Sequence, residues 1–205
     1  MGKARKAAVV LLFAATVPWA LTGCSNNSGE AEANAAPAHN RHGAPIVTNP
    51  LNVDRFARDP CSVLSAQQLR QLTQSIKMAP TGKARPNTAG RTCDYTSMTD
   101  FTLQHGSINF ITSGSGLTGL YAKRTDFKLF EELPRIEGYP AVIVDLIDAR
   151  KQGECSISVG VNDRVIANFD LAISDFEDTL QSDEEPCKAT LELARAGIRS
   201  MKGEA

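Results

Sequence analysis

The first 24 residues constrain the rest of the chain more than any other stretch, because they decide the compartment in which it folds. Three basic side chains lie among the first six residues, and an apolar run then extends from Ala7 to Leu21. A basic start, a short apolar core and small residues before a cleavage point are typical of a secretory signal peptide. A membrane-spanning helix needs about 20 apolar residues, and this shorter run is interrupted by Pro18. We therefore expect an exported chain rather than one retained by a transmembrane helix.

The tetrapeptide Leu21-Thr22-Gly23-Cys24 resembles the processing site of bacterial lipoproteins. This resemblance implies cleavage between Gly23 and Cys24, a diacylglycerol group on the Cys24 thiol and, usually, an acyl chain on its new amine. A single acyl chain binds membranes only marginally, whereas two or three give stable anchoring. We expect a protein held by lipid on Cys24 to the extracytoplasmic face of the cell membrane.

Three parts of the chain follow from this site. Residues 1–23 are the expected lipoprotein signal peptide, and residues 24–45 are the expected lipidated cysteine and disordered tether, because they have no apolar periodicity. Residues 46–205 have a usual size for a single extracytoplasmic α+β domain. His39 and His42 fall in the tether, where solvated histidines without a fixed partner indicate a linker. We expect no metal and no cofactor.

The charge of the mature chain is mildly acidic. Residues 1–23 hold three of the 22 Lys and Arg and no acid, which leaves 19 basic side chains against 23 Asp and Glu. This balance gives no electrostatic footprint for nucleic acid, so we expect no nucleic-acid partner. Anionic lipid would weakly repel such a surface, and the lipid on Cys24 therefore has to hold the protein at the membrane.

Four cysteines remain when Cys24 is lipidated: Cys61, Cys93, Cys155 and Cys187. An even number in an exported chain predicts two disulfides, for which three connectivities are possible. We favour Cys61–Cys93 with Cys155–Cys187, each closing a loop of about 32 residues and stabilising the fold by about 3.5–4 kcal/mol. No Cys-x-x-Cys occurs, so the disulfides are expected to be structural rather than catalytic.

Local patterns predict the elements of the domain. Ser65 and Gln68 form a capping box before a helix with Leu69, Leu72 and Ile76 on one face. Composition and alternation predict strands at 92–97, 107–112 and 141–147, a short helix over 117–124 and a loop over 79–91, and leave the apolar series 127–133 unassigned.

A hairpin is predicted from residues 155–161 and 165–171, in which apolar and polar positions alternate. A two-residue turn would mix the faces of the two strands, whereas a three-residue loop over 162–164 pairs Val161 with Val165 and Ile157 with Phe169. Because a one-residue slip moves every side chain to the other face, we expect the odd-length loop.

The last element is expected to be a helix that begins near Pro186. Acidic residues precede it, and proline is tolerated in a first turn. Apolar residues then recur at helical spacing on one face: Cys187, Leu191, Ala194, Ile198 and Met201. The elements together predict an α+β fold, an antiparallel β-sheet with helices packed on one face and two disulfides.

Several stretches together resemble one family, the actinobacterial lipoproteins of domain-of-unknown-function family 3558. They are Asn49-Pro50-Leu51 running into Asp59-Pro60-Cys61, Gly138-Tyr139-Pro140-Ala141-Val142, Cys155 leading to Val159-Gly160-Val161, and Cys187 opening the last helix. The resemblance covers about residues 45–202. It implies export, lipidation and an α+β domain with paired cysteines, and it supplies no activity and no catalytic residue.

Three candidate sites carry weaker signals. Residues 114–119 match G-x-G-x-x-G, but no repeated βαβ pattern accompanies them, so we interpret them as a loop. His105, the only histidine of the domain, is interpreted as a solvated residue of a polar turn. A group of carboxylates before the last helix matches no calcium-loop spacing and is interpreted as a solvated surface: Asp175, Glu177, Asp178, Asp183, Glu184 and Glu185.

Two classes of function therefore stay open. The first is a non-enzymatic binding or sensing module of the cell envelope, with a protein, glycan or small ligand as its partner. The second is an envelope enzyme with an unrecognised site. No nucleophile–base motif is present in the sequence, which favours binding. A concave apolar pocket ringed by polar groups would support ligand binding, and several shifted carboxylates in such a pocket would support an enzyme.

Overall fold

The computed structural model of this chain describes residues 40–88, 90–99, 102–175 and 185–204. The predicted signal peptide, Cys24 and His39 lie outside the described residues. So do residues 176–184, which include most of the acidic group before the last helix.

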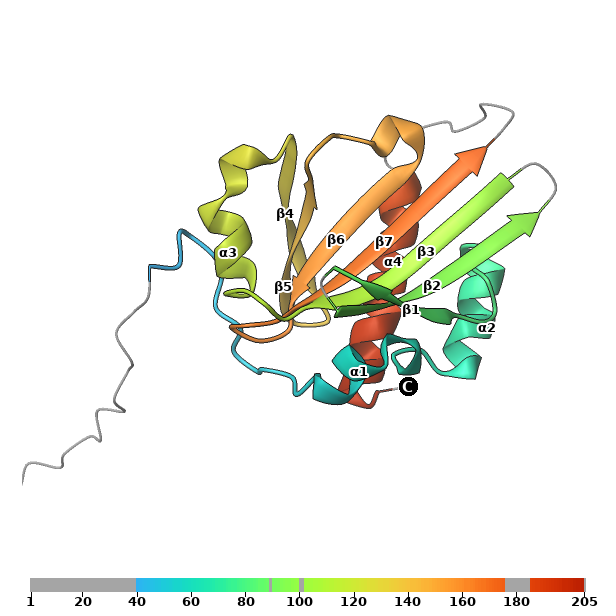
Figure 1. The fold of residues 1–205 in the computed structure, drawn as a ribbon, viewed down its shortest axis with the longest axis horizontal. Coiled ribbons are helices and arrows are strands. Elements are labelled where there is room, and N and C mark those ends of the chain that lie inside the picture. Colours follow the sequence, from blue (N-terminus) through green and yellow to red (C-terminus); the bar gives the residue numbers. More distant parts are fainter. Residues whose placement is uncertain (1–39, 89, 100–101, 176–184, 205) are drawn as a thin grey trace, which may run out of the picture. The chain divides into compact units, whose positions relative to one another are not determined.

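A seven-stranded antiparallel sheet, in the order β1-β2-β3-β7-β6-β5-β4, forms the centre of the fold (Figure 1). Its strands are β1 (Lys83–Asn87), β2 (Gly90–Thr99), β3 (Thr102–Ile111), β4 (Leu129–Ile136), β5 (Tyr139–Asp145), β6 (Glu154–Gly160) and β7 (Ile166–Asp175). The described residues also form α1 (Asp54–Arg58), α2 (Ala66–Ser75), α3 (Leu117–Ala122) and α4 (Glu185–Lys202), with short 3₁₀ turns η1 (Pro60–Ser62), η2 (Arg124–Asp126) and η3 (Arg150–Gln152).

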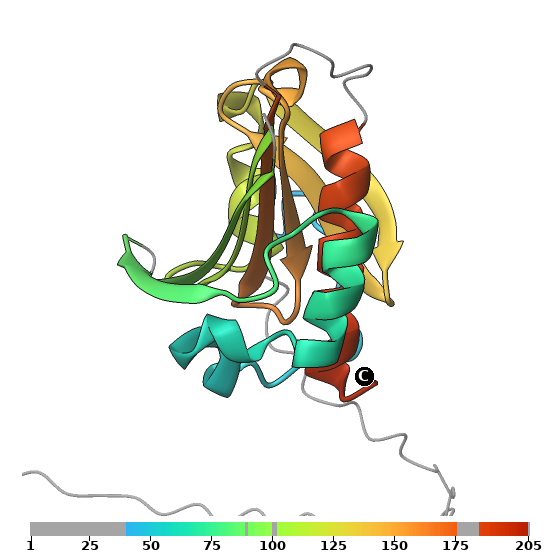
Figure 2. The ribbon, with the colours of Figure 1, turned by 90° about the vertical axis from the view of Figure 1, so that its right-hand side faces the viewer.

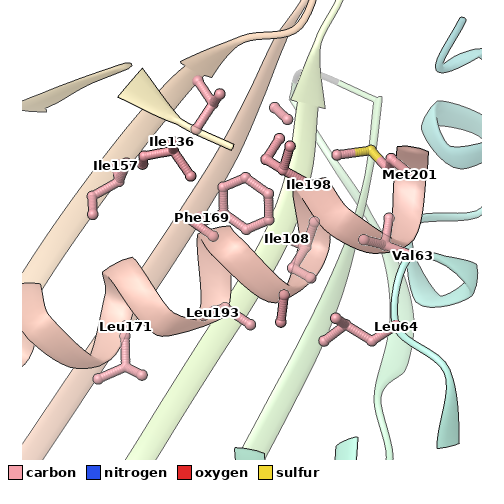
Figure 3. Packing of buried hydrophobic residues seen from close by; sticks show 14 of the residues in the cluster. Val63, Leu64, Ile108, Ile136, Ile157, Phe169, Leu171, Leu193, Ile198 and Met201 are labelled. Atoms are coloured by element: carbon pink, nitrogen blue, oxygen red, sulfur yellow. The ribbon is translucent and has the colours of Figure 1, made fainter. Parts of the chain in front are cut away.

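Helices α2 and α4 lie on one face of the sheet, as the view in Figure 2 shows. Between α4 and the sheet, Phe169 of β7 lies close to Ile198 and Leu193 in the largest apolar cluster (Figure 3). Gly197 permits this close approach, because a Cβ at that position would lie 2.5 Å from the Phe169 ring. The predicted α+β fold class, with helices packed against an antiparallel sheet, is confirmed.

A second, smaller apolar cluster lies on the opposite face of the sheet. Leu117 and Tyr121 of α3 pack there against Val142, Val144 and Ile166. The neighbours Ala141 and Ile143 of β5 belong to the main cluster instead, so β5 is buried on both faces. On this face α3 lies beside β4, and no helix that the structure describes lies over β2 and β3 (Figure 1).

The capping box and the hairpin register are confirmed. Ser65 accepts from the Gln68 amide while the Gln68 side chain accepts from the Ser65 amide, at the start of α2. In the hairpin, Ile157 pairs with Phe169 across β6 and β7. The Val161 amide donates to the Val165 carbonyl, as the three-residue loop requires.

Two assignments from the sequence need correction. The predicted loop over 79–91 contains strand β1, which pairs only with β2 at the edge of the sheet. An edge strand tolerates proline. Pro86 had therefore wrongly indicated a loop. The unassigned series 127–133 leads into β4, whose alternation is hidden because its two faces pack against different clusters.

Both disulfides have the favoured connectivity. Cys61 pairs with Cys93, with Cα atoms 5.0 Å apart, and Cys155 pairs with Cys187, with Cα atoms 5.1 Å apart. The first ties η1 to β2, and the second ties the first turn of α4 to β6. Each joins segments that are distant in sequence across the main core.

The folded part of the chain begins earlier than the predicted boundary at residue 46. The Arg41 side chain donates to the carbonyls of Ala44 and Pro45 and to Asp163 of the β6–β7 loop. Ala44 itself is buried in the cluster under α3. The last residues of the predicted tether therefore belong to the domain.

Candidate functional site

An apolar depression of about 270 Å³ lies between the first turns of α4 and the strands β4, β5 and β6. We call it the α4 groove. It is lined by Glu131, Leu133, Ile143, Arg150, Ile157, Cys187, Lys188 and Leu191.

The floor and walls of the α4 groove come from four different elements. Ile143 of β5 and Ile157 of β6 are buried and form the floor. Leu133 of β4 and Leu191 of α4 are only half-buried, and both contact the main core. The N-terminal members of the predicted α4 stripe, Cys187 and Leu191, thus line a groove. Its later members, Ala194, Ile198 and Met201, are buried.

The wall that α4 contributes is fixed in place. The Cys155–Cys187 disulfide joins this first turn to β6. One turn further on, the Thr190 hydroxyl is within 3.4 Å of the Cys155 carbonyl and 2.7 Å of the Pro186 carbonyl. The groove is therefore bounded by a covalent link and a buried hydroxyl rather than by a mobile segment.

Charged side chains form the rim of the α4 groove. The Arg150 guanidinium lies 2.9 Å from Glu131 and binds both oxygens of Asp148, at 2.8 and 2.6 Å. These hydrogen bonds lower the pKa of the Asp148 carboxyl and raise that of Arg150. Lys188 of α4 also lines the groove. The result is an apolar depression with a polar rim, the arrangement expected of a ligand site.

The sheet face opposite α4 carries a polar cluster centred on Asp170 of β7, away from α3. Its carboxylate accepts hydrogen bonds from Ser107 at 2.9 Å, Asn109 at 3.3 Å and Asn168 at 2.9 Å. Burial raises the pKa of Asp170, although these hydrogen bonds oppose the shift. Asp170 lines a depression of about 400 Å³ together with His105, Ser107 and Ser156.

His105 lies in strand β3 and not in the polar turn that the sequence indicated. The error arose because polar side chains on the uncovered face of a strand have the composition of a turn. The hairpin register places His105 opposite Thr96, and Thr96 Oγ1 lies 3.1 Å from His105 Nδ1. His105 Nε2 lies 3.9 Å from Asp94, which is ion-paired with Arg85. Sequence alone could not find this hydroxyl–imidazole contact, since it depends on strand pairing.

The G-x-G-x-x-G stretch, residues 114–119, runs into the first turn of α3, and its central glycine serves packing. Gly116 has φ 56°, and a Cβ there would lie 2.8 Å from the Asp163 carbonyl oxygen. The loop therefore packs against the β6–β7 turn, and the strands around it are antiparallel rather than arranged as βαβ units. Across the described ranges, no group of three or more His, Cys, Asp or Glu is placed to hold a metal ion.

Comparison with known proteins places the chain in a family. The family described as "Protein of unknown function (DUF3558)" matches residues 19–199, and the chain belongs to it. No curated protein and no solved structure gives a match. Among the helices that the structure describes, none combines the length and apolar character needed to cross a bilayer.

Proposed function

We propose that this protein is a lipid-anchored, extracytoplasmic binding module of the cell envelope, and that its ligand site is the α4 groove. The anchor is the lipid on Cys24, and the ligand is a small amphipathic molecule with an aliphatic part. The observation that carries the ligand site is the apolar depression with a charged rim.

Export is supported by the N-terminal sequence and by the disulfides. The basic start, apolar run and Cys24 form a lipoprotein-type leader. The four remaining cysteines pair within the domain, which suits an oxidising compartment and not the cytosol.

The chemistry of the α4 groove supports an aliphatic ligand. Leu133, Ile143 and Leu191 offer branched aliphatic surface, and their side chains carry no hydrogen-bonding group. Transfer of apolar surface from water into such a site contributes about 25 cal/mol per Å². The ion-paired side chains at the rim, Arg150 with Glu131 and Asp148, form a polar edge beside which a head group can lie while the aliphatic part lies below it.

Titration of the full chain with a dansyl-labelled fatty acid tests the ligand site. We expect saturable binding, weakened about tenfold by Leu191→Glu, because the new carboxylate lines the apolar wall. Leu146→Glu is the matched control, since Leu146 is 66% exposed and lies outside the groove. Leu133→Gln repeats the test from β4 in case Leu191→Glu does not fold. Equal binding by the folded groove variants and the wild type would contradict the proposal, as would the absence of saturable binding.

An envelope enzyme is the second candidate, and one observation favours it. Thr96, His105 and Asp94 place a hydroxyl, an imidazole and a carboxylate in sequence on the uncovered face. A hydroxyl activated in this way can attack an ester. Binding is nevertheless preferred, because Asp94 is already engaged by Arg85.

Hydrolysis of para-nitrophenyl acetate separates the two candidates. An enzyme predicts turnover that His105→Ala and Thr96→Val both abolish, whereas a binding module predicts rates that neither substitution changes. Activity that depends on both residues would replace the binding proposal with the enzyme.

A further inference from the structure

A polar depression of about 380 Å³ lies between α2 and α4, away from the residues of the α4 groove. We call it the helix groove. It is lined by Ser65, Gln67, Gln68, Gln71, Leu72, Ser75, Glu192, Arg195, Ala196, Arg199 and Glu204.

The Gln68 side chain holds together α2 and α4, the two walls of the helix groove. Its amide oxygen accepts a hydrogen bond from Ser65 in the capping box of α2. Its amide nitrogen donates a hydrogen bond to the Ala196 carbonyl oxygen of α4, at 3.1 Å. Gln68 is buried by this double role. The two helices are therefore held together by a buried hydrogen bond, and a ligand would not have to separate them.

Each helix presents a polar row to the helix groove. On α2, Gln67, Gln71 and Ser75 recur every four residues, so their row extends about 12 Å along the helix at 1.5 Å per residue. On α4, Arg195 and Arg199 are one turn apart. A row of this length suits an elongated ligand better than a single ion.

The side chains of these rows are available for a ligand. In the part of the chain that the structure describes, Gln67, Gln71 and Ser75 are exposed and make no side-chain hydrogen bond. Within the same described residues, Arg195 likewise has no ion-pair partner. Arg199 contacts Glu137 through only one of its terminal nitrogens.

The balance of charge and hydrogen-bonding groups defines the ligand class. Two arginines and two glutamates line the helix groove, so their formal charges cancel. The glutamine amides both donate and accept, the guanidiniums donate and the carboxylates accept. A hydroxyl group can donate to one kind of partner and accept from the other, whereas a carboxylate ligand only accepts and an ammonium ligand only donates.

We propose that the helix groove binds a neutral saccharide. Its hydroxyls lie along the α2 row and accept from Arg195 on the α4 side. This site is independent of the proposed function, because it shares no lining residue with the α4 groove.

Amide chemical-shift titration of the full chain with neutral methyl glycosides tests this site. The probes are the methyl glycosides of glucose, galactose, mannose and arabinose, with glucuronate and glucosamine as charged counterparts of one ring. We expect at least one neutral glycoside to shift the amides of Gln67, Gln71 and Arg195 saturably. Shifts with glucuronate or glucosamine alone would overturn the proposal, and so would the absence of shifts with every neutral glycoside.

Paired glutamine variants make the test specific. Gln71→Ala is expected to weaken glycoside binding about fivefold to tenfold, which is the effect of one net hydrogen bond. Gln74→Ala is the matched control, because Gln74 is an exposed residue of α2 outside the groove lining. Equal weakening by both variants would also overturn the proposal. Gln71→Ala should leave the binding of the dansyl fatty acid unchanged, because Gln71 does not line the α4 groove. The two sites are therefore tested separately.

Discussion

At the residue scale, folding disfavours the charged form of the Asp170 carboxyl group. It lies on the sheet face opposite α4, and burial raises its pKa despite hydrogen bonds from Ser107 and Asn168. The unfolded chain ionises the same group near pH 3.9. The native state therefore holds the proton to higher pH, and stability from this group falls as pH rises above about 4 through the folded pKa.

Asp170→Asn removes this titration and is expected to change the pH dependence of stability. Urea unfolding of variant and wild type between about pH 4 and pH 8 measures the difference in free energy of unfolding. As pH rises, the free energy of unfolding of the variant should increase relative to that of the wild type, because only the wild type loses stability through ionisation of this group. A difference that stays constant with pH would contradict the raised pKa.

At the element scale, α2 depends on its capping box more than on its length. The helix has only 10 residues, and Ser65 and Gln68 satisfy backbone and side-chain groups at its start. The same Gln68 side chain also ties α2 to α4. Loss of the cap should therefore affect both the helix and the helix groove.

Ser65→Ala is expected to lower the free energy of unfolding by about 1 kcal/mol, the usual effect of removing an N-cap side chain. This corresponds to a fall in Tm of about 2–4 °C for a chain of this size. Thermal unfolding followed by circular dichroism measures it. Ser65→Thr keeps a hydroxyl that both accepts from the Gln68 amide and donates to the Gln68 side chain, so it should lose much less. Equal losses in both variants would show that the cap is not the cause.

Elements with local signals could be predicted from the sequence, and elements defined by their neighbours could not. The Ser65 box and the register of Ile157 with Phe169 depend on spacing within one segment, and both are confirmed. Strand β1 was not predicted, because Pro86 normally argues against a strand. An edge strand, which β1 is, tolerates proline. The α4 groove was not predictable, because Leu133 and Leu191 meet only through tertiary packing.

At the scale of the whole molecule, two disulfides of equal sequence separation have different neighbours. Each spans 32 residues, so the chain-entropy model gives them equal effects on stability. Cys187 lines the α4 groove, whereas Cys61 and Cys93 do not. The Cys61–Cys93 disulfide is therefore a natural control for the role of the Cys155–Cys187 disulfide in ligand binding.

Replacing each cysteine pair by alanine is expected to lower the free energy of unfolding by about 2–5 kcal/mol. Only the Cys155→Ala/Cys187→Ala variant should also weaken dansyl fatty acid binding at temperatures where both variants are folded. Fluorescence titration beside urea unfolding checks both effects. Equal loss of binding in the Cys61→Ala/Cys93→Ala variant would contradict a specific role for the second disulfide.

Mass spectrometry of the protein purified from cell envelopes tests whether it is exported, lipid-anchored and disulfide-bonded. We expect a chain that begins at Cys24, carries a diacylglycerol group on that residue, and contains intact Cys61–Cys93 and Cys155–Cys187 disulfides. An unmodified Cys24, an intact leader, or four reduced thiols in cytosolic material would contradict it.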